Sequence, residues 1–324
     1  MMSAYDYELP VSAIAQTPIE PRDAARLLVA TDNDGSVAHR HVRDLPELLD
    51  DGDVLVVNET RVLPARLHLQ KQTGGAVEVL LLEEIDGHWE ALVRPGRRVP
   101  PGTVLQGAPG LVVEVGDHVG DGRRRVRVDG DLAQHGEVPL PPYIHESLAD
   151  TERYQTVYAT TPGSVAAPTA GLHLTDGVLD RCRAHGIIVA TVDLAVGLDT
   201  FRPVTADKPE DHQIHSERYH VSQETLDTCR RARRVVAVGT TTVRALESAA
   251  RGPLSGRTSL FIHGDFDFQV VDVLLTNFHL PRSSLLLLLS SFAGERWRDL
   301  YKTALAEGYR FLSFGDAMLV GRAA

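Results

Sequence analysis

The apolar pattern of this 324-residue chain changes its period twice, and that change constrains the fold more than any single motif. Between about residues 62 and 128, nearly every segment is typical of a short or alternating β-strand, and Gly- and Asp-containing turns separate the strands. Five strands at this spacing predict a small antiparallel sheet or half-barrel. The expected strands are 61–70, 76–82, 88–94, 111–115 and 125–128.

On both sides of this segment, strands alternate with helices. Before it, residues 26–30 and 53–58 predict strands and 44–49 a short helix; after Tyr154, helices over 175–185, 222–234, 242–251, 283–292 and 296–307 alternate with strands over 187–194, 235–239, 259–262, 270–275 and 317–320. This alternation favours an α/β layer with largely parallel strands. We therefore predict an α/β main domain over 1–62 and 152–324, either barrel-like or an open mixed sheet with helices. An inserted all-β antiparallel half-barrel domain over 63–151 interrupts it.

Composition narrows the class of partner. The chain has 33 Lys and Arg against 44 Asp and Glu, a formal net charge of −11. This balance argues against bulk, non-specific nucleic-acid binding but allows a local basic patch.

Cys182 and Cys229 lie far apart with no CxxC, which excludes a disulfide framework and a thiolate zinc site of known spacing. The apolar run 285–289 is too short to cross a bilayer. We expect a cytoplasmic protein with no membrane partner.

Three segments combine small, hydroxylic and imidazole side chains near the ends of predicted strands. Residues 163–173 precede a helix N-terminus, where unpaired N–H groups favour an anion, although such a loop alone is more often a tight connection. Residues 238–247 and 275–281 belong beyond strand ends, where open α/β sheets bind ligands. Neither has a dinucleotide or Walker-type motif. Alternatively, Thr240 caps a helix, Arg244 is a surface charge and His279 is a structural histidine.

Two further features are less specific. Residues 211–217 offer two His and two carboxylates, but i, i+3 histidines without a clear third ligand favour a site without metal. Arginine clusters at 94–98, 123–127 and 230–234 are usually solvated faces. Two of the three fall inside the predicted insert, where a nucleic-acid footprint would be sought.

Several long and unusual strings recur in an order that resembles one known family. They include Tyr5-Asp-Tyr-Glu-Leu-Pro10, Asn58-Glu-Thr-Arg-Val-Leu-Pro-Ala-Arg66, Leu92-Val-Arg-Pro-Gly-Arg-Arg98, Glu152-Arg-Tyr-Gln-Thr-Val-Tyr-Ala159 and Phe314-Gly-Asp-Ala-Met-Leu319. Nearly end to end, the chain resembles the S-adenosylmethionine:tRNA ribosyltransferase-isomerases of queuosine biosynthesis. The resemblance implies an α/β domain with an all-β insert, S-adenosylmethionine as co-substrate and no metal.

The resemblance also implies a reaction. The ribosyl group of S-adenosylmethionine is transferred and isomerised onto 7-aminomethyl-7-deazaguanine at the wobble position of a tRNA anticodon stem-loop. The products are epoxyqueuosine-tRNA, adenine and methionine. Because the sulfonium acidifies the adjacent 5′ carbon, a base must remove a proton there. A general acid should help adenine depart, and the attacking amine must be neutral.

Candidate residues follow from these demands and from the three segments above. The predicted acid–base groups are His173, Asp193 and His279. The residues predicted to hold the co-substrate and the nucleobase are Ser164, Ala167, Thr169, Gly171, Gly239, Thr240, Thr241, Arg244, Thr276 and Asn277. Those predicted to meet anticodon phosphates are Arg22, Arg61, Arg66, Arg97 and Arg98. We expect the protein to be a monomer.

The chain departs from the family pattern at one pocket loop. The family usually reads Leu-His-Val-Gly-x-Gly-Thr-Phe, where this chain has Leu194-Ala-Val-Gly-Leu-Asp-Thr-Phe201. Ala195 thus replaces an imidazole and Asp199 replaces a glycine. Two alternatives therefore stay open: a transferase of the same fold that uses S-adenosylmethionine on another amine, and a non-catalytic tRNA-binding paralogue.

Overall fold

The computed structural model describes residues 1–32, 34–197 and 203–323, which form two compact units. Unit 1 comprises Met1–Thr60, Pro141–Thr161 and Ala167–Ala324, and unit 2 comprises Arg61–Leu140 and Pro162–Ala166. Unit 2 is shorter than the predicted insert over 63–151, because the chain already packs on unit 1 after Pro141. There, Gln16 Nε2 donates to the Tyr143 carbonyl over 2.9 Å, and the Tyr143 hydroxyl lies 2.7 Å from Ser313 Oγ.

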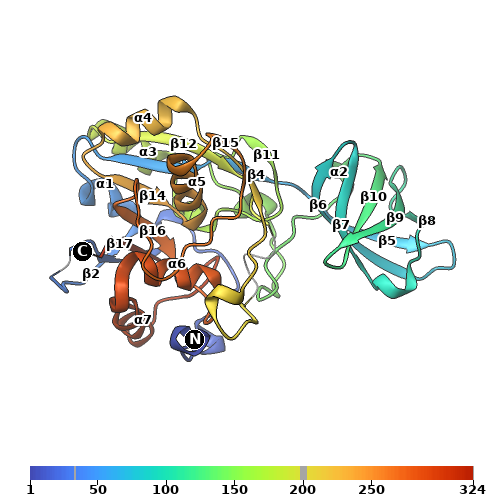
Figure 1. Ribbon diagram of the computed structural model, residues 1–324, viewed down its shortest axis with the longest axis horizontal. Coiled ribbons are helices and arrows are strands. Elements are labelled where there is room, and N and C mark those ends of the chain that lie inside the picture. The colour runs from blue at the N-terminus through green and yellow to red at the C-terminus, as the bar shows by residue number, and fades with distance from the viewer. Residues whose placement is uncertain (33, 198–202, 324) are drawn as a thin grey trace. The chain divides into compact units, whose positions relative to one another are not determined.

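Unit 1 is built on an open mixed sheet (Figure 1). In the described part of the chain it has nine strands, in the order β15-β13-β12-β3-β14-β16-β17-β1-β2. The central neighbours β12, β3, β14 and β16 run parallel, and so do β1 and β17; the remaining pairs are antiparallel. The sheet is therefore less parallel than predicted. Its strands are β1 Arg26–Ala30, β2 Ala38–His41, β3 Val54–Asn58, β12 Ile188–Leu194, β13 Glu217–His220, β14 Val235–Val238, β15 Ser255–Thr258, β16 Val273–Asn277 and β17 Ala317–Gly321.

Helices cover both faces of this sheet. They are α1 Leu45–Leu48, α3 Asp176–Ala184, α4 Gln223–Arg231, α5 Thr240–Arg251, α6 Ser284–Ala293 and α7 Trp297–Ala306. Residues of α1 and α3 pack with Leu55, Val236 and Leu275 in one hydrophobic cluster. Helix α5 contacts β3, β12 and β14, and α6 contacts β17, outside that cluster. Because both faces are covered, every residue of β3, β14, β16 and β17 is buried.

Side-chain caps explain where three of these helices begin. Thr175, Ser222 and Ser283 each accept a hydrogen bond from a backbone N–H in the first turn of α3, α4 and α6. These caps satisfy N–H groups that have no partner within the helix. The predicted starts of all three helices are confirmed.

One predicted strand of unit 1 is wrong. Residues 259–262 form no strand, and the edge strand β15 lies just before them, paired with β13. Leu260 cannot join the ladder, because its N–H donates to Thr258 Oγ1 over 3.1 Å and its carbonyl accepts from Arg244 Nε over 3.0 Å.

Unit 2 contains a closed antiparallel barrel rather than the half-barrel predicted. In its described residues the strand order is β10-β7-β6-β5-β8-β9. Strand β8 was not predicted, since only Leu105 of its four residues is buried, yet it pairs with both β5 and β9 and closes the barrel. The strands are β5 Arg66–Lys71, β6 Ala76–Ile85, β7 His88–Arg94, β8 Thr103–Gln106, β9 Val112–Gly120 and β10 Arg123–Asp129; β4 Thr60–Val62 pairs with β11 Thr161–Ser164, and α2 spans Leu132–His135.

The arginine cluster of β10 is only partly a solvated face. Arg124 is 1% exposed and donates to the carbonyls of Gly116 and Val99, at 2.7–3.0 Å. Its guanidinium therefore joins segments of unit 2. Among the described helices of both units, none has the length and apolarity needed to span a membrane.

Candidate active site

Most of the predicted site residues of unit 1 lie at one edge of its sheet. The parallel strands β12, β3, β14 and β16 end there at Leu194, Asn58, Val238 and Asn277. Six predicted residues stand at or just beyond these ends: Asp193, Gly239, Thr240, Thr241, Thr276 and Asn277. In open α/β sheets the carboxyl ends of parallel strands are the usual place for a ligand.

A hydrogen-bonded chain of three side chains joins two of the predicted segments. Asn277 Nδ2 lies 3.1 Å from His173 Nε2, and Asn277 Oδ1 accepts from Thr169 Oγ1 over 2.8 Å. Thr169 and His173 are the ends of a short 3₁₀ helix, Thr169–His173. Because the amide nitrogen can only donate, the Nε2 atom of His173 accepts, and a neutral ring then carries its proton on Nδ1.

His173 is held in its neutral form. Burial, and to a smaller extent the nearby Arg310, Arg153 and Arg22, lower the pKa of its imidazole to about 3. His173 is 4% exposed. At neutral pH the ring is therefore uncharged, and any proton that it accepts is readily passed on.

His279 is a second buried, neutral imidazole. Burial lowers its pKa to about 3, and its Nε2 lies 3.0 Å from Thr276 Oγ1. Its backbone N–H donates to the Tyr301 hydroxyl over 2.8 Å, and its carbonyl accepts from the Tyr7 hydroxyl. His279 follows β16 and precedes α6, so these tyrosines satisfy groups that no strand or helix partner satisfies.

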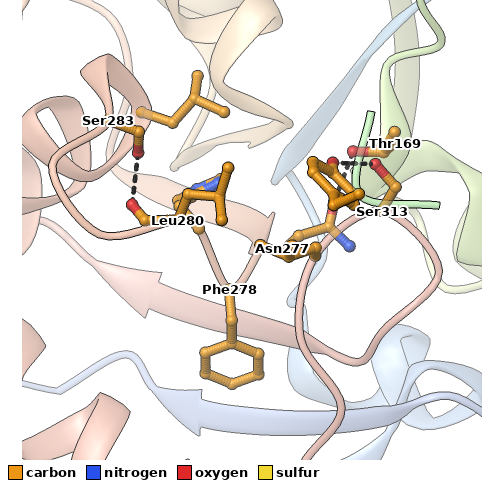
Figure 2. Close-up of a pocket in the computed structure, with 10 residues that line it drawn as sticks. Thr169, Asn277, Phe278, Leu280, Ser283 and Ser313 are labelled. Carbon is orange, nitrogen blue, oxygen red and sulfur yellow. Dashed lines mark hydrogen bonds between the residues drawn. The ribbon is translucent and has the colours of Figure 1, made fainter. Parts of the chain in front are cut away.

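A small pocket opens beside this chain of side chains. Figure 2 shows Thr169, Asn277 and Ser313 on one side of it, with Ser283 hydrogen-bonded to the Leu280 carbonyl on the other. Its lining is mostly apolar, with a few polar groups, and carries no full charge: within the described chain it includes no Asp, Glu, Lys or Arg. The lining residues are Tyr143, Thr169, Asn277, Phe278, His279, Leu280, Ser283, Leu285, Leu312 and Ser313.

The backbone around this pocket adopts rare conformations. Of the described non-glycine residues, Asp86 and Asp121 with positive φ lie in Asp-Gly hairpin turns, whereas Leu312 (φ +69°) lines the pocket and Arg282 (φ +55°) lies between two lining residues. Such a conformation costs about 1–3 kcal/mol and persists only where surrounding contacts enforce it. The Leu312 N–H is held by the Phe278 carbonyl at 3.1 Å.

Two predicted glycines are required by geometry. A Cβ on Gly171 would lie 1.9 Å from the Tyr158 hydroxyl, so only glycine allows this approach. Gly239 has φ +88° immediately before α5, a conformation that other residues rarely adopt. Neither glycine lines the pocket; both shape the segments that carry Thr169, His173 and Thr240.

Another group of predicted residues gathers around Asn58 rather than the pocket. Asn58 Nδ2 donates to Thr241 Oγ1 over 3.2 Å and to the Leu194 carbonyl over 3.0 Å. Asp193 is buried and pairs with Arg218 over 3.1 Å. Burial raises the pKa of Asp193, while Arg218 and the Thr60 hydroxyl oppose the rise. Asp193 therefore lies at the same sheet edge but does not line the pocket.

Arg244 occupies a structural position. Its guanidinium forms a buried ion pair with Glu217, and Glu217 Oε1 in turn accepts from the Gly197 N–H over 2.9 Å. The cation is thus already neutralised within unit 1.

Among the other predicted residues, Ala167 is buried in unit 1, whereas Ser164 belongs to unit 2 and donates to the Ala166 carbonyl over 2.6 Å. Asp199 lies outside the described residues.

The arginines predicted to meet phosphates differ in availability. Arg22 donates to the carbonyls of Gln155, Leu172 and Glu152 at 2.8–3.2 Å, which joins segments of unit 1. Arg66 is half-buried and lies 3.8 Å from Glu78, and Arg61 is also half-buried. Arg97 and Arg98 are exposed in unit 2. Only these last two present a largely solvated guanidinium.

Sequence reasoning missed several pocket residues. Tyr143, Leu312 and Ser313 line the pocket, and Tyr7 and Tyr301 hold His279. Tyr7 stands in the string Tyr5–Pro10 that resembles the family, and that was its only signal. Among the described residues, no three His, Cys, Asp or Glu side chains gather as metal ligands would, and this includes the 211–217 segment.

The fold and the site together define an α/β protein with an all-β insert and a mostly apolar pocket, carrying a few polar groups, at the carboxyl edge of its sheet. A family model described as queuosine biosynthesis protein matches residues 2–320. The chain belongs to this family.

Relatives match over nearly the full length. The chain is 53% identical to an S-adenosylmethionine:tRNA ribosyltransferase-isomerase of Thermus thermophilus, covering 98% of this chain and 99% of that protein. It is 52% identical to the protein of the same name from Rubrobacter xylanophilus, covering 97% and 96%. A crystal structure of S-adenosylmethionine tRNA ribosyltransferase from Thermotoga maritima is 37% identical, with a TM-score of 0.57 and coverage of 98% and 99%.

Proposed function

We propose that this protein is an enzyme of queuosine biosynthesis that transfers and isomerises the ribosyl group of S-adenosylmethionine onto tRNA. The observation that carries the proposal is the full-length similarity to enzymes of that name, at 53% and 52% identity. The acceptor that we propose is 7-aminomethyl-7-deazaguanine at the wobble position, and the products are epoxyqueuosine-tRNA, adenine and methionine.

We propose that the nucleoside part of the co-substrate binds at this pocket. The cavity volume in this structure is only about 20 Å³, so its walls must move apart to admit the nucleoside. The hydroxyl, amide and imidazole groups of the pocket stand among Phe278, Leu280 and Leu312, a combination that suits a base and a ribose. In this assignment Thr169, Asn277 and Ser313 bind polar atoms of the nucleoside. Their own hydrogen bonds fix their orientation before the co-substrate enters.

The buried imidazoles suit proton transfer within one active site. In the ring as described, Asn277 occupies the lone pair of Nε2 and the proton is on Nδ1, so His173 acts as a base only after the Asn277 amide releases Nε2. The neutral ring can then accept the proton from the 5′ carbon beside the sulfonium, and the charged ring that results is a strong acid in this environment. The same proton can then go to the departing adenine, so that the imidazole ends the cycle neutral. His279 and Asp193 are the other proposed acid–base groups, and Asp193 acts from the Asn58 side of the sheet edge.

The tRNA contact that we propose uses unit 2. Arg97 and Arg98 are exposed, whereas Arg22 already binds three carbonyls of unit 1. We therefore assign the two exposed arginines to anticodon-loop phosphates and treat Arg22, Arg61 and Arg66 as secondary candidates. We further propose that the enzyme acts in the cytoplasm as a monomer.

Adenine release tests the proposal. The protein is incubated with S-adenosylmethionine and an anticodon hairpin that carries the aminomethyl deazaguanine, with an unmodified hairpin as control. We expect adenine only with the modified hairpin. Ala195, where the family usually has an imidazole, motivates the two alternatives. Binding of the hairpin without release of adenine would indicate a non-catalytic binding paralogue. Release of adenine with small amines, together with no binding of the hairpin, would indicate a different transferase.

A further inference from the structure

The first residues of the chain lie against the segments that build the pocket. We call residues 1–16 the N-terminal strap. The Tyr5 carbonyl accepts from the Arg282 N–H over 2.9 Å, and the Phe311 N–H donates to the Ala13 carbonyl over 2.7 Å. Arg282 and the residue after Phe311 are the two positive-φ positions beside the pocket. The strap thus supports both rare conformations.

Between these two contacts, the strap reaches His279. The Tyr7 hydroxyl donates to the His279 carbonyl, and the His279 N–H donates to the Tyr301 hydroxyl. The Tyr7 and Tyr301 rings meet edge to face, with centroids 5.2 Å apart. Both backbone polar groups of one pocket residue are therefore held by two touching tyrosines from opposite ends of the chain.

This arrangement leaves the imidazole of His279 little freedom. Its backbone is fixed on both sides, and its ring is fixed by Thr276 Oγ1 at 3.0 Å. Burial raises the pKa of both tyrosines, so each hydroxyl keeps its proton. The ring contacts of Tyr301 with Trp297 and Phe311 hold it in turn. A side chain held in this way is preorganised for a reaction that needs one orientation.

We propose that Tyr7 and Tyr301 are positioning residues for His279, and that the N-terminal strap is a built-in part of the active site. The role in turnover rests on the proposed function. The geometric part, that the Tyr7 hydroxyl sets the orientation of the His279 ring, does not depend on it.

The variant Tyr7→Phe tests this directly, because it removes the hydroxyl and keeps the ring packing. Tyr219→Phe is the matched control, since the Tyr219 hydroxyl also donates to a backbone carbonyl, that of Pro253, away from the pocket. For Tyr7→Phe we expect kcat for adenine release to fall between about ten- and a hundred-fold. KM for S-adenosylmethionine should change by less than about two-fold. Tyr219→Phe should keep the wild-type kcat.

A double-mutant cycle separates positioning from general damage. In a His279→Ala background, Tyr7→Phe should have no further effect on kcat, because there is no ring left to orient. The proposal would be overturned if Tyr7→Phe lowered kcat by the same factor in the His279→Ala background as in the wild type. It would also be overturned if Tyr7→Phe alone kept the wild-type kcat. Full turnover by His279→Ala would overturn it too.

A measurement without substrate distinguishes failure of this proposal from failure of the proposed function. Nuclear magnetic resonance of the histidine-labelled protein reports the ring environment of His279, assigned by its loss in His279→Ala. Tyr7→Phe should shift that resonance, and Tyr219→Phe should not. An unmoved resonance overturns the positioning role even if the wild-type enzyme releases adenine. A moved resonance supports it even if the co-substrate proves to be different.

Discussion

At the scale of single residues, the site is organised by the amide of Asn277. Its nitrogen donates to His173 and its oxygen accepts from Thr169, so one side chain sets the orientation of two others. Alanine at this position would leave the His173 ring free to rotate and would remove the donor that selects its tautomer.

We expect Asn277→Ala to reduce adenine release by about ten- to a hundred-fold with a folded protein. Ser248→Ala is the control. Ser248 lies toward the C-terminal end of α5, away from the pocket, and its hydroxyl makes a 2.6 Å hydrogen bond to that of Thr258 on β15. Circular dichroism would check that both variants fold. Wild-type release by Asn277→Ala would show that the amide does not organise the site.

The buried imidazoles predict how stability depends on pH. Burial lowers the pKa of His173 and of His279 to about 3 in the folded protein, whereas the unfolded value is about 6.5. Between these values the unfolded chain binds more protons, so the free energy of unfolding falls as pH decreases below about 6.5. Each histidine adds a slope of up to about 1.4 kcal/mol per pH unit.

Urea unfolding across pH 5–7.5 would measure that slope. We expect His279→Gln to reduce it relative to the wild type, since one of the two protons no longer titrates. His88→Gln, at the exposed first residue of β7 in unit 2, is the control. An unchanged slope in His279→Gln would mean that this ring is not held neutral.

The sequence could predict which site residues cluster, but not their partners. His173, Thr169, Asn277 and His279 stand in segments that end strands or precede helices, and such positions meet at one sheet edge for topological reasons. Tyr7 lies 272 residues from His279 and Tyr143 lies 170 from Ser313. Contacts over such distances depend on packing that no local pattern encodes.

At the scale of elements, helix α6 links the stability of unit 1 to its pocket. Ser283 caps α6 by accepting from the Leu286 N–H over 3.2 Å, and it also lines the pocket and donates to the Leu280 carbonyl. One hydroxyl thus begins the helix and fixes the turn that follows His279.

We expect Ser283→Ala to lower the free energy of unfolding by about 1 kcal/mol and to weaken binding of S-adenosylmethionine. Ser222→Ala removes an equivalent cap from α4, which does not line the pocket. It should lower stability similarly and leave binding intact. Titration calorimetry measures the binding of S-adenosylmethionine, and urea unfolding measures the free energy of unfolding. If both variants bound S-adenosylmethionine equally well, Ser283 would act only as a helix cap and not as part of the binding site.

Elements were predicted well where local signals were strong. The capped helices and the continuous apolar strands β3 and β14 were predictable from propensity and pattern. Strand β8 was not, because a four-residue strand with one buried side chain lacks a pattern of its own. It forms because β5 and β9 offer it partners, which is a tertiary cause.

At the scale of the whole molecule, charge is divided unevenly between the two units. Unit 2 holds ten Lys and Arg against eleven Asp and Glu, a net charge of −1, so unit 1 carries the remaining −10. A polyanion such as tRNA is therefore repelled much less by unit 2. This distribution was hidden in the overall value of −11.

We expect the double variant Arg97→Glu, Arg98→Glu to weaken tRNA hairpin binding and to reduce the slope of log K against log salt concentration by about one to two. Arg125→Glu, Arg127→Glu reverses two other exposed arginines of the same barrel and is the control. It should change the slope less. Equal effects would indicate diffuse attraction rather than a defined contact.

The position of β17 has a consequence for how the protein is made. This strand, Ala317–Gly321, lies between β16 and β1 inside the sheet. During synthesis on the ribosome, β1 can therefore pair with β17 only after almost the entire chain has been made. The pocket is also completed late in synthesis, because Leu312 and Ser313 line it. A nascent chain stalled before residue 312 would hold most of the polypeptide but neither β17 nor two residues of the pocket, so β1 would present an unpaired edge, which is the kind of exposed strand edge that favours aggregation.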